Sequence, residues 1–363
     1  MSVNVAIIGG GTISEQHLSA ASGSPRATLV AVCDLDESRA GRMAEDYDVP
    51  YYLDVEQLLA SEDLDVVHVC TPVQTHFSLA ESAIAAGVAV IVEKPATETL
   101  AELDDLQELS DAHEVPVSVI HQHQFSPAMR QARALVEDGQ IGTVRGADLI
   151  YTGFSRPDTE NRGEWTFDLP GGEFEEGLPH PIYLGLNGGY PRSETDVTAI
   201  TSLMREYDRE FSYDAAQVQF VTETGGLSNF KILSGGHATR MLFVHGETGT
   251  VTVDFVSQTV LHGTHDYFGS PIDRARKNID ESVARLSRLV EMGGSLAMEK
   301  VSGDWNREKE LDPHKYQIDE MYRVVEEGGE VPVSLEEARW TITLMEQIRD
   351  AAESTVASRT PSH

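Results

Sequence analysis

A Glu93-Lys94-Pro95 tripeptide stands directly after the apolar run at residues 88–92. That run is short, apolar and rich in β-branched residues, which is typical of a buried parallel strand. Open α/β sheets bind ligands at the carboxyl ends of their strands, so we expect the Lys94 ammonium to face a bound cofactor, with Glu93 beside it. The alternative is a lysine that reaches from the strand end into solvent.

A glycine-rich turn, Gly9-Gly10-Gly11-Thr12-Ile13-Ser14, follows the apolar run at residues 3–8 and opens a helical segment. In this context the turn is a candidate dinucleotide site. Gly9 permits the tight turn, and Gly11 lets the backbone approach a pyrophosphate. Thr12 and Ile13 lead into a helix, and the unpaired N–H groups at the start of this helix attract the negative charge of the pyrophosphate. The alternative is a glycine turn with a purely structural role.

Asp34 ends the second expected strand, about 20 residues after the glycines. A carboxylate at this place can accept hydrogen bonds from the hydroxyls of an adenine ribose, and it repels a 2'-phosphate. We therefore expect NAD as the cofactor and NADP to be disfavoured, with Arg39 as the neighbour that argues for NADP. The alternative is that Asp34 caps the helix that begins near Glu37.

Another strand end carries Thr71-Pro72, and His76 follows four residues later. The hydroxyl and backbone of Thr71 can contact the nicotinamide ribose, Pro72 stiffens the turn, and we expect His76 to belong to the same cofactor site. The competing interpretation is that Gln74 or Thr75 caps the next helix.

Up to about residue 120, short β-rich runs alternate with amphipathic helical stretches. This pattern predicts a Rossmann-type, doubly wound parallel sheet with helices on both faces. After that residue the expected strands are longer, and their apolar residues alternate with polar ones. This pattern predicts an α+β domain with an open, mostly antiparallel sheet. We expect an NAD(P)-binding domain over residues 1–122 and a substrate-binding and oligomerisation domain over residues 123–363.

Two further segments of the second domain stand out. Residues 169–191 are rich in glycine and proline, and loops of this composition inside a domain are often functional. Residues 272–292 predict an inserted amphipathic helix, which we expect to pack on its own domain or on a neighbouring subunit. The alternative is a peripheral contact with a membrane, which the basic residues of this helix would favour.

The 363-residue chain is strongly acidic, with 60 Asp and Glu against 27 Lys and Arg and a formal charge of -33. Such a surface repels nucleic acid and anionic lipid, so neither is expected as a partner. Molar salt shortens the Debye length to about 3 Å and screens this self-repulsion, which favours a halophilic host over an ordinary acidic protein. No apolar run is long enough to span a membrane and no leader is visible, so we expect a cytoplasmic location.

Taken together, these features resemble the Gfo/Idh/MocA family of oxidoreductases. The matching features are Gly9-x-Gly11-x-Ile13, Asp34, Thr71-Pro72-x-x-x-His76, Glu93-Lys94-Pro95 and the junction Phe125-Ser126-Pro127. The resemblance covers about the first 145 residues well and the second domain more loosely. It implies an NAD(P)-dependent dehydrogenase of sugars, polyols or sugar derivatives, in a homo-oligomer formed through an open sheet.

The resemblance also implies a catalytic set in the glycine-rich segment, where the family carries a histidine one helical turn after an aspartate. His180 takes the histidine position here and Glu176 the aspartate position. Gln122 replaces an asparagine that lies near the nicotinamide, and Tyr183 stands where many relatives carry an acid.

The chemistry of this set is coherent, since oxidising a secondary alcohol removes a hydroxyl proton and a hydride. His180 is the expected base because imidazole titrates near neutral pH. Lys94 would stabilise the developing alkoxide, and Glu176 would orient the imidazole or assist a proton relay. His121 and His123 alternate at a strand end and are expected to bind substrate hydroxyls from one face; no third ligand accompanies them, so no metal is expected.

We therefore predict an enzyme that transfers a hydride between a secondary alcohol of a sugar, polyol or sugar derivative and NAD. The alternative is a catalytically silent regulatory or scaffold protein of the same fold that binds a dinucleotide or a sugar. The presence of both Lys94 and His180 favours the enzyme.

Overall fold

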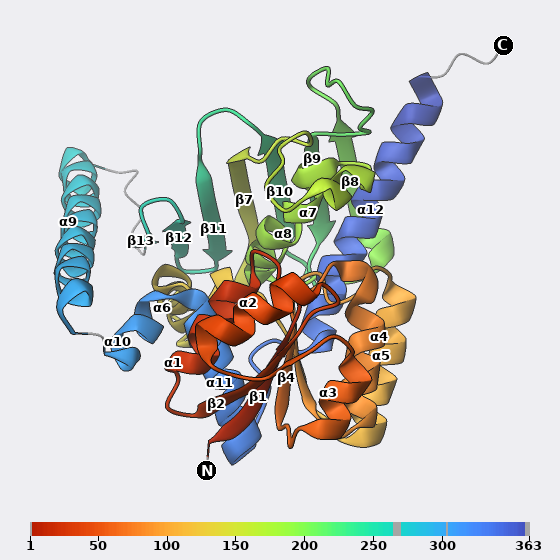
Figure 1. Cartoon of the computed structure of the whole chain (residues 1–363). Helices are drawn as coiled ribbons and strands as arrows, with labels where there is room; N and C mark the ends of the chain where they lie inside the picture. Colours follow the sequence, from red (N-terminus) through yellow and green to blue (C-terminus); the bar gives the residue numbers. More distant parts are fainter. Residues whose placement is uncertain (1, 264–269, 303, 360–363) are drawn as a thin grey trace. The chain divides into compact units, whose positions relative to one another are not determined.

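The computed structural model describes residues 2–263, 270–302 and 304–359, and its chain divides into two compact units (Figure 1). The first unit comprises Met1–Ser126 together with Gly303–Ile342, and the second comprises Pro127–Ser302 together with Thr343–His363. From the sequence we expected residues 123–363 to form one domain. The segment that returns to the first unit was not anticipated.

The first unit contains a six-stranded sheet with the order β3-β2-β1-β4-β5-β6. Its strands are β1 (Val3–Ile8), β2 (Ala27–Cys33), β3 (Tyr51–Tyr52), β4 (Val66–Val69), β5 (Ala89–Val92) and β6 (Val117–Val119). Every neighbouring pair is parallel, so all six carboxyl ends lie at one edge of the sheet. The strand order reverses direction at β1 and β4, which confirms the doubly wound fold expected from the sequence.

Helices cover both faces of this sheet (Figure 1). They are α1 (Ser14–Gly23), α2 (Glu37–Tyr47), α3 (Val55–Ser61), α4 (His76–Ala85), α5 (Leu100–His113), α10 (Trp305–Leu311), α11 (Pro313–Glu327) and the first part of α12 (Leu335–Arg359), with short 3-10 turns η1 (Val73–Thr75) and η2 (Gln122–Phe125). Val5 and Ile7 of β1 pack with α1 and α11, whereas Ala6 and Ile8 pack in the cluster on the opposite face. Burial on both faces explains why these strands read as continuous apolar runs.

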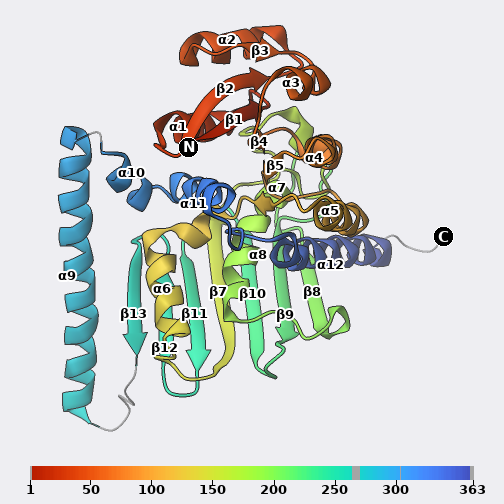
Figure 2. The same ribbon diagram turned by 90° about the horizontal axis from the view of Figure 1, so that it is seen from below.

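The second unit contains a seven-stranded sheet with the order β13-β12-β11-β7-β10-β9-β8, visible from β13 to β8 in Figure 2. Its strands are β7 (Val144–Phe154), β8 (Val197–Ser202), β9 (Ala215–Val221), β10 (Leu227–Ser234), β11 (Arg240–Gly246), β12 (Thr250–Asp254) and β13 (Thr259–Gly263). Only β7 and β10 pair in parallel; the other neighbours are antiparallel. The expected open, mostly antiparallel sheet is therefore confirmed.

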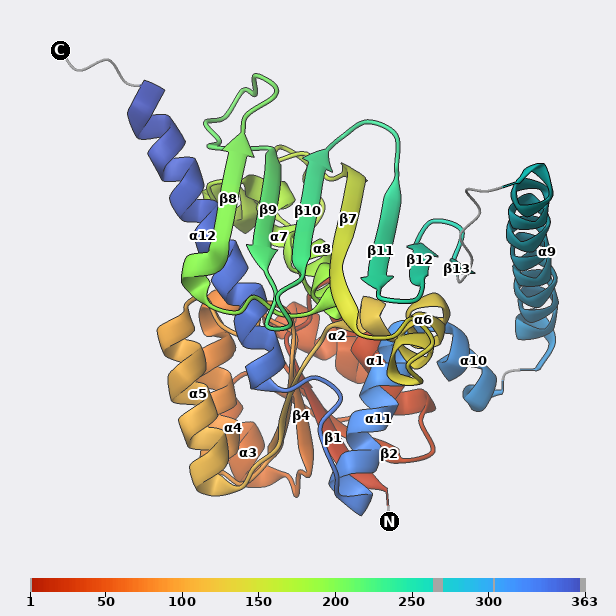
Figure 3. The same ribbon diagram turned by 180° about the vertical axis from the view of Figure 1, so that it is seen from behind.

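The helices of this unit cover one face of the sheet, and Figure 3 shows the other face of β8, β9, β10 and β7 without a helix in front of it. They are α6 (Pro127–Glu137), α7 (Gly172–Gly177), α8 (Pro179–Gly185) and the remainder of α12, with 3-10 turns η3 (Glu164–Asp168), η4 (Leu186–Gly188) and η5 (Glu194–Asp196). Helix α9 (Pro271–Ser302) lies beside the edge strand β13 (Figure 2). Helix α8 packs closely on the sheet, because a side chain at Gly185 would overlap the ring of Phe230. The glycines of the segment thus serve close packing.

Helix α9 contains the expected amphipathic helix of residues 272–292 and is longer than predicted. Ile272, Ile279 and Leu286 on this helix are exposed. Helix α9 contacts β13, the edge strand of the second sheet, and Figure 2 shows the helix beside this strand. Over the described ranges, no helix has both the length and the apolar character needed to cross a membrane.

Candidate active site

The parallel sheet gathers the predicted cofactor residues at the carboxyl ends of its strands. The glycine turn follows β1, Asp34 follows β2, Thr71 and Pro72 follow β4, Glu93 and Lys94 follow β5, and Gln122 follows β6. Backbone bonds tie neighbouring ends together: the N–H of Gly9 donates to the carbonyl of Cys33 (2.8 Å), and that of Glu93 donates to Val69 (3.0 Å). This edge, at the point where strand order reverses, is where open α/β sheets bind ligands.

The glycines of the turn have different roles. Gly9 has a φ of +101°, and a Cβ there would lie 2.7 Å from the carbonyl oxygen of Cys70, so the fold itself requires glycine. A Cβ at Gly11 would meet only that same oxygen, at 4.0 Å, and Gly11 and Thr12 are both exposed. Gly11 therefore leaves room for a group to approach the backbone where α1 begins, which fits a pyrophosphate.

Asp34 closes the glycine turn. Its Oδ2 accepts the N–H of Gly10 (2.6 Å) and its Oδ1 accepts that of Asp36 (2.7 Å), while Arg39 donates to it through Nη2 (2.9 Å). Burial raises the pKa of this carboxyl, but the hydrogen bonds from Arg39, Asp36 and Gly10 outweigh it and hold the pKa below its usual value. The cap of α2 is Asp36, which accepts from Ser38 and Arg39, so the capping alternative for Asp34 is wrong.

The turn after β4 is held by side chains that bond to its backbone. Oγ1 of Thr75 lies 2.9 Å from the carbonyl oxygen of Pro72 and 2.8 Å from Oγ1 of Thr71, and it makes no side-chain cap bond to α4. The two ring nitrogens of His76 lie 2.8 Å from the carbonyl of Thr71 and 2.9 Å from that of Pro95. His76 thus links the strand-end turns of β4 and β5, and its part in binding a cofactor stays a prediction.

Glu93 and Lys94 are both buried. Lys94 is 8% exposed, which contradicts the alternative of a lysine that reaches into solvent. The carboxylate of Glu93 accepts the backbone N–H of Lys94 at Oε2 (3.1 Å), and its Oε1 lies 3.1 Å from Nε2 of His17. Burial raises the pKa of Glu93, but His17, His314 and Lys94 lower it to about 2, so this carboxylate is ionised at neutral pH.

The end of β6 differs from the expectation. The strand ends at Val119 and Gln122 opens a 3-10 turn, so His121 and His123 do not alternate along a strand. Oε1 of Gln317 accepts the backbone N–H of His121 (3.0 Å), and burial lowers the pKa of the His121 imidazole to about 3. Gln122 is buried at this strand end.

In the second unit, Glu176 and His180 lie on consecutive helical segments. Helix α7 runs into α8 through Leu178, whose backbone is helical, and Pro179 occupies the first turn of α8, where a missing N–H costs little. Glu176 pairs with Arg162, whose Nη1 lies 2.7 Å from Oε2, and Arg162 also pairs with the buried Glu173. The carboxylate expected to assist the histidine is therefore held by a guanidinium.

The imidazole of His180 contacts a tyrosine. Its Nδ1 lies 2.9 Å from the hydroxyl of Tyr183, and the two rings meet edge to face at 84°. If Nδ1 carries the proton and donates to the hydroxyl oxygen, Nε2 has the lone pair that a general base needs. Tyr183, at the position where an acid was expected from the family resemblance, thus lies in hydrogen-bond contact with His180. An orienting role for Glu176 stays a prediction.

Several contacts were missed from the sequence. From the sequence alone, Arg39 counts only as a residue that would favour NADP. Its place in the first turn of α2, five residues after Asp34, is the feature from which an ion pair with Asp34 could have been predicted. His17 lies on α1, one turn after the glycines, and pairs with a residue 76 positions away, which no local pattern reveals. Within residues 2–263, 270–302 and 304–359, no group of three or more His, Cys, Asp or Glu could hold a metal ion.

Several known proteins are similar to this chain. Residues 3–121 match the family described as oxidoreductase family, NAD-binding Rossmann fold (Gfo/Idh/MocA). Inositol 2-dehydrogenase of Rhizobium meliloti (strain 1021) is 27% identical over 311 residues, which cover 81% of this chain and 92% of that relative.

Two solved structures share the whole fold. Levoglucosan dehydrogenase, in complex with NADH and levoglucosan, has a TM-score of 0.76 at 17% identity and covers 98% of both chains. UDP-N-acetylglucosamine 3-dehydrogenase from Acidithiobacillus ferrooxidans has a TM-score of 0.70 at 19% identity, with 98% of this chain and 99% of that chain covered. Residues 3–121 thus resemble the NAD-binding domain of the Gfo/Idh/MocA oxidoreductases, and a dehydrogenase is among the relatives that align over most of the chain.

Proposed function

We propose that the protein is an NAD-dependent dehydrogenase that transfers a hydride between a secondary alcohol of a sugar, polyol or sugar derivative and the nicotinamide. The observation that carries this proposal is the arrangement of the first unit, in which an open glycine turn, an ionised Asp34 and a buried Lys94 follow three strands of one parallel sheet. A site of this kind offers a place for a dinucleotide and a cation for an alkoxide.

The substrate class rests on the relatives. Inositol 2-dehydrogenase and levoglucosan dehydrogenase are both named for compounds that carry several secondary hydroxyl groups. Their likeness to this chain supports a polyhydroxylated substrate, and neither name identifies the one used here.

Residues of the first unit would hold the dinucleotide. Gly9, Gly11, Thr12 and Ile13 would surround the pyrophosphate, and Asp34 would accept the ribose hydroxyls. Thr71, Pro72 and Gln122 would lie toward the nicotinamide, as would Glu93 and Lys94. When bound, the cofactor supplies the acceptor or donor of the hydride.

The protein's own groups would handle the hydroxyl proton and the oxygen. His180 would accept the proton at Nε2, because Nδ1 faces the hydroxyl of Tyr183. The Lys94 ammonium would donate a hydrogen bond to the substrate oxygen as negative charge develops on it. Glu176 would assist the proton transfer, and its negative charge would be paired with the Arg162 guanidinium.

Lys94→Ala tests the proposal, with Lys277→Ala as the matched control because Lys277 is exposed on α9. The substrate panel contains inositols, aldoses and nucleotide sugars, NADH formation is followed in molar KCl, and NADH binding is measured separately. We expect Lys94→Ala to lose at least about 100-fold in kcat/KM and to retain NADH binding, while Lys277→Ala behaves as wild type.

Equal turnover by Lys94→Ala and wild type would refute the role of Lys94. If the wild type binds NADH but turns over no member of the panel with either NAD or NADP, the silent binding protein of the same fold becomes the better account.

We also propose a homo-oligomer formed through the uncovered face of the second sheet (Figure 3). Ile150, Ile200 and Leu227 are exposed on its strands, and their burial between copies would remove apolar surface from water. Light scattering of Ile200→Asp against wild type tests this, since a closed interface through this face would lose subunits in the variant.

A further inference from the structure

Four buried side chains form a line of hydrogen bonds through the first unit. Nε2 of His17 on α1 lies 3.1 Å from Oε1 of Glu93, and Nδ1 of His17 lies 2.8 Å from Nδ1 of His68 on β4. Nε2 of His68 lies 2.9 Å from the hydroxyl of Tyr322 on α11. Four elements distant in sequence thus meet in one polar path.

Chemistry permits one polarity for this path when Glu93 is ionised and both histidines are neutral. The carboxylate can only accept, so His17 must donate through Nε2–H and accept at Nδ1. His68 must then donate through Nδ1–H and accept at Nε2, and the Tyr322 hydroxyl must donate. Every polar atom in the path is satisfied by this arrangement.

Burial supports two of these protonation states. It lowers the pKa of the fully buried His68 imidazole well below its usual value, so this ring is neutral. The pKa of Glu93 lies below its usual value, so its carboxylate is ionised. The other titratable groups acting on these residues are His314 and Asp319 of α11, Cys70 and His121 at strand ends, and the Lys94 ammonium.

The path ends at the backbone of Lys94. Oε2 of Glu93 accepts the Lys94 N–H, while Oε1 is held by His17. A carboxylate fixed at one oxygen by a rigid, buried partner has little freedom at the other, so the position of Lys94 depends on the histidines.

We propose that His17, supported by His68 and Tyr322, is a positioning residue that holds Glu93 and thereby the backbone of Lys94 in place. This inference rests on the proposed function, because it assigns the path a purpose in placing the lysine that faces the substrate oxygen.

Packing alone does not account for the path. His68 lies between Ile7 of β1 and Ile91 of β5 in the sheet, and both belong to an apolar core cluster, so an apolar side chain could fill the same space. The end of α1 is already joined to α11 by another buried bond, in which Ser24 donates to Asp319 (2.5 Å). Ser24→Ala therefore removes a buried bond between the same two elements and leaves Glu93 untouched, which makes it the matched control.

The first test is nuclear magnetic resonance of the full-length protein labelled with 15N at the histidine rings and the backbone. We expect His17 as the Nε2–H tautomer and His68 as the Nδ1–H tautomer at neutral pH. Tyr322→Phe should leave both histidines in these tautomers, because Nδ1 of His17 still needs the proton on Nδ1 of His68. If His17 in the wild type carries its proton on Nδ1 and not on Nε2, it cannot donate to Glu93, and the proposal is overturned.

The second test compares two changes at one position. Gln at residue 17 can still donate to Glu93 through its amide, whereas Leu cannot. In His17→Leu the Lys94 amide proton should exchange about 10- to 100-fold faster. His17→Gln should restore most of the protection, and Ser24→Ala should leave it unchanged even if its Tm falls as much as that of His17→Leu.

Kinetics complete the test where the wild type turns over a substrate. His17→Leu should lose up to about 100-fold in kcat with little change in NADH affinity, and His17→Gln should recover most of it. An unchanged Lys94 amide in His17→Leu, or equal losses in His17→Leu and Ser24→Ala, would overturn the proposal. Absence of turnover in the wild type counts against the dehydrogenase function alone, since the tautomers and the amide exchange test the path independently.

Discussion

Arg39 binds both carboxylate oxygens of Asp34, with Nε 3.2 Å from each and Nη2 2.9 Å from Oδ1. Asp34, the acid expected to favour NAD, is therefore paired with Arg39, the basic residue that would favour NADP. Arg39 is nevertheless exposed, and the neighbouring Leu35 is 88% exposed. The edge of the proposed ribose site thus combines an apolar surface with an ion pair, and we expect this ion pair to set the choice of dinucleotide.

Asp34→Ser should release Arg39 and raise the affinity for NADPH. A 2'-phosphate would lose the repulsion of the carboxylate and gain a free guanidinium, and we expect at least about a tenfold gain, equivalent to about 1.4 kcal/mol. The measurement is the Kd of NADH and NADPH by titration calorimetry at matched salt.

Arg39→Ala is the matched control for that change. It keeps the carboxylate and removes its cation, so NADPH should bind more weakly than to the wild type while NADH changes little. An unchanged ratio of the two Kd values in Asp34→Ser would contradict the account of Asp34 as the residue that selects the dinucleotide.

Strand ends were the most predictable part of the site. Runs of β-branched residues followed by glycine, acid or lysine located β1, β2 and β5, and a parallel sheet necessarily brings their carboxyl ends to one edge. The positions of Gly11, Asp34 and Lys94 followed from this rule, since each lies in the turn that follows a strand.

Contacts between distant segments could not be predicted in the same way. Residues 303–342 rejoin the first unit and bring Tyr322 to His68, a pairing 254 positions apart in the sequence. The amphipathic pattern of α11 indicates a helix with one buried face, and nothing in a single sequence states which sheet that face covers. The path from Glu93 to Tyr322 was missed for this reason.

Glu93 should contribute to stability in a way that depends on pH. Its pKa is about 2 in the folded protein against an ordinary 4.5, so the carboxylate stabilises the fold fully above about pH 4.5. As pH falls from there toward 2 the unfolded chain takes up the proton first, and the contribution of about 3 kcal/mol is lost. Urea unfolding of wild type and Glu93→Gln at a series of pH values measures it.

Glu98→Gln is the control for the pH series, because Glu98 is exposed on the loop that follows Pro95. The difference between wild type and Glu93→Gln should shrink as the solution is acidified below pH 4.5, while Glu98→Gln stays near zero throughout. A constant difference across the series would mean that the ionised form of Glu93 gives no stability.

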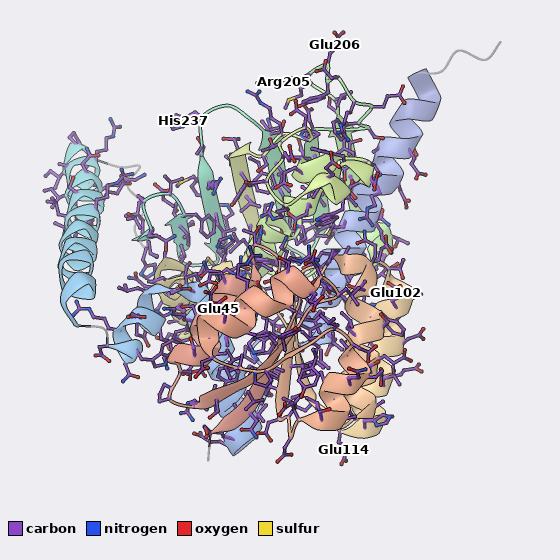
Figure 4. All side chains as sticks on the ribbon, viewed as in Figure 1. Glu45, Glu102, Glu114, Arg205, Glu206 and His237 are labelled. Carbon is purple, nitrogen blue, oxygen red and sulfur yellow. The ribbon has the colours of Figure 1, made fainter. Side chains whose placement is uncertain are left out.

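Salt should stabilise the protein strongly. The formal charge is -33, and acidic side chains such as Glu114 and Glu206 project from the surface (Figure 4). Screening of their repulsion predicts a Tm that rises steadily from low salt to molar KCl. Sucrose of equal osmolality is the control, and a Tm that gains no more from KCl than from sucrose would remove the support for a halophilic host.

Tyr183→Phe should weaken the base without removing it. The hydroxyl lies 2.9 Å from Nδ1 of His180, and its loss frees the imidazole to adopt either tautomer, so a smaller share of molecules has the lone pair at Nε2. We expect kcat/KM to fall by about tenfold, the value of one hydrogen bond, against about 100-fold or more for His180→Gln. Tyr190→Phe, a tyrosine outside α8, provides the control, and its rates should match the wild type. If Tyr183→Phe also matches the wild type while His180→Gln is inactive, the tyrosine hydroxyl does not orient the base, and Glu176 becomes the residue to test for that role.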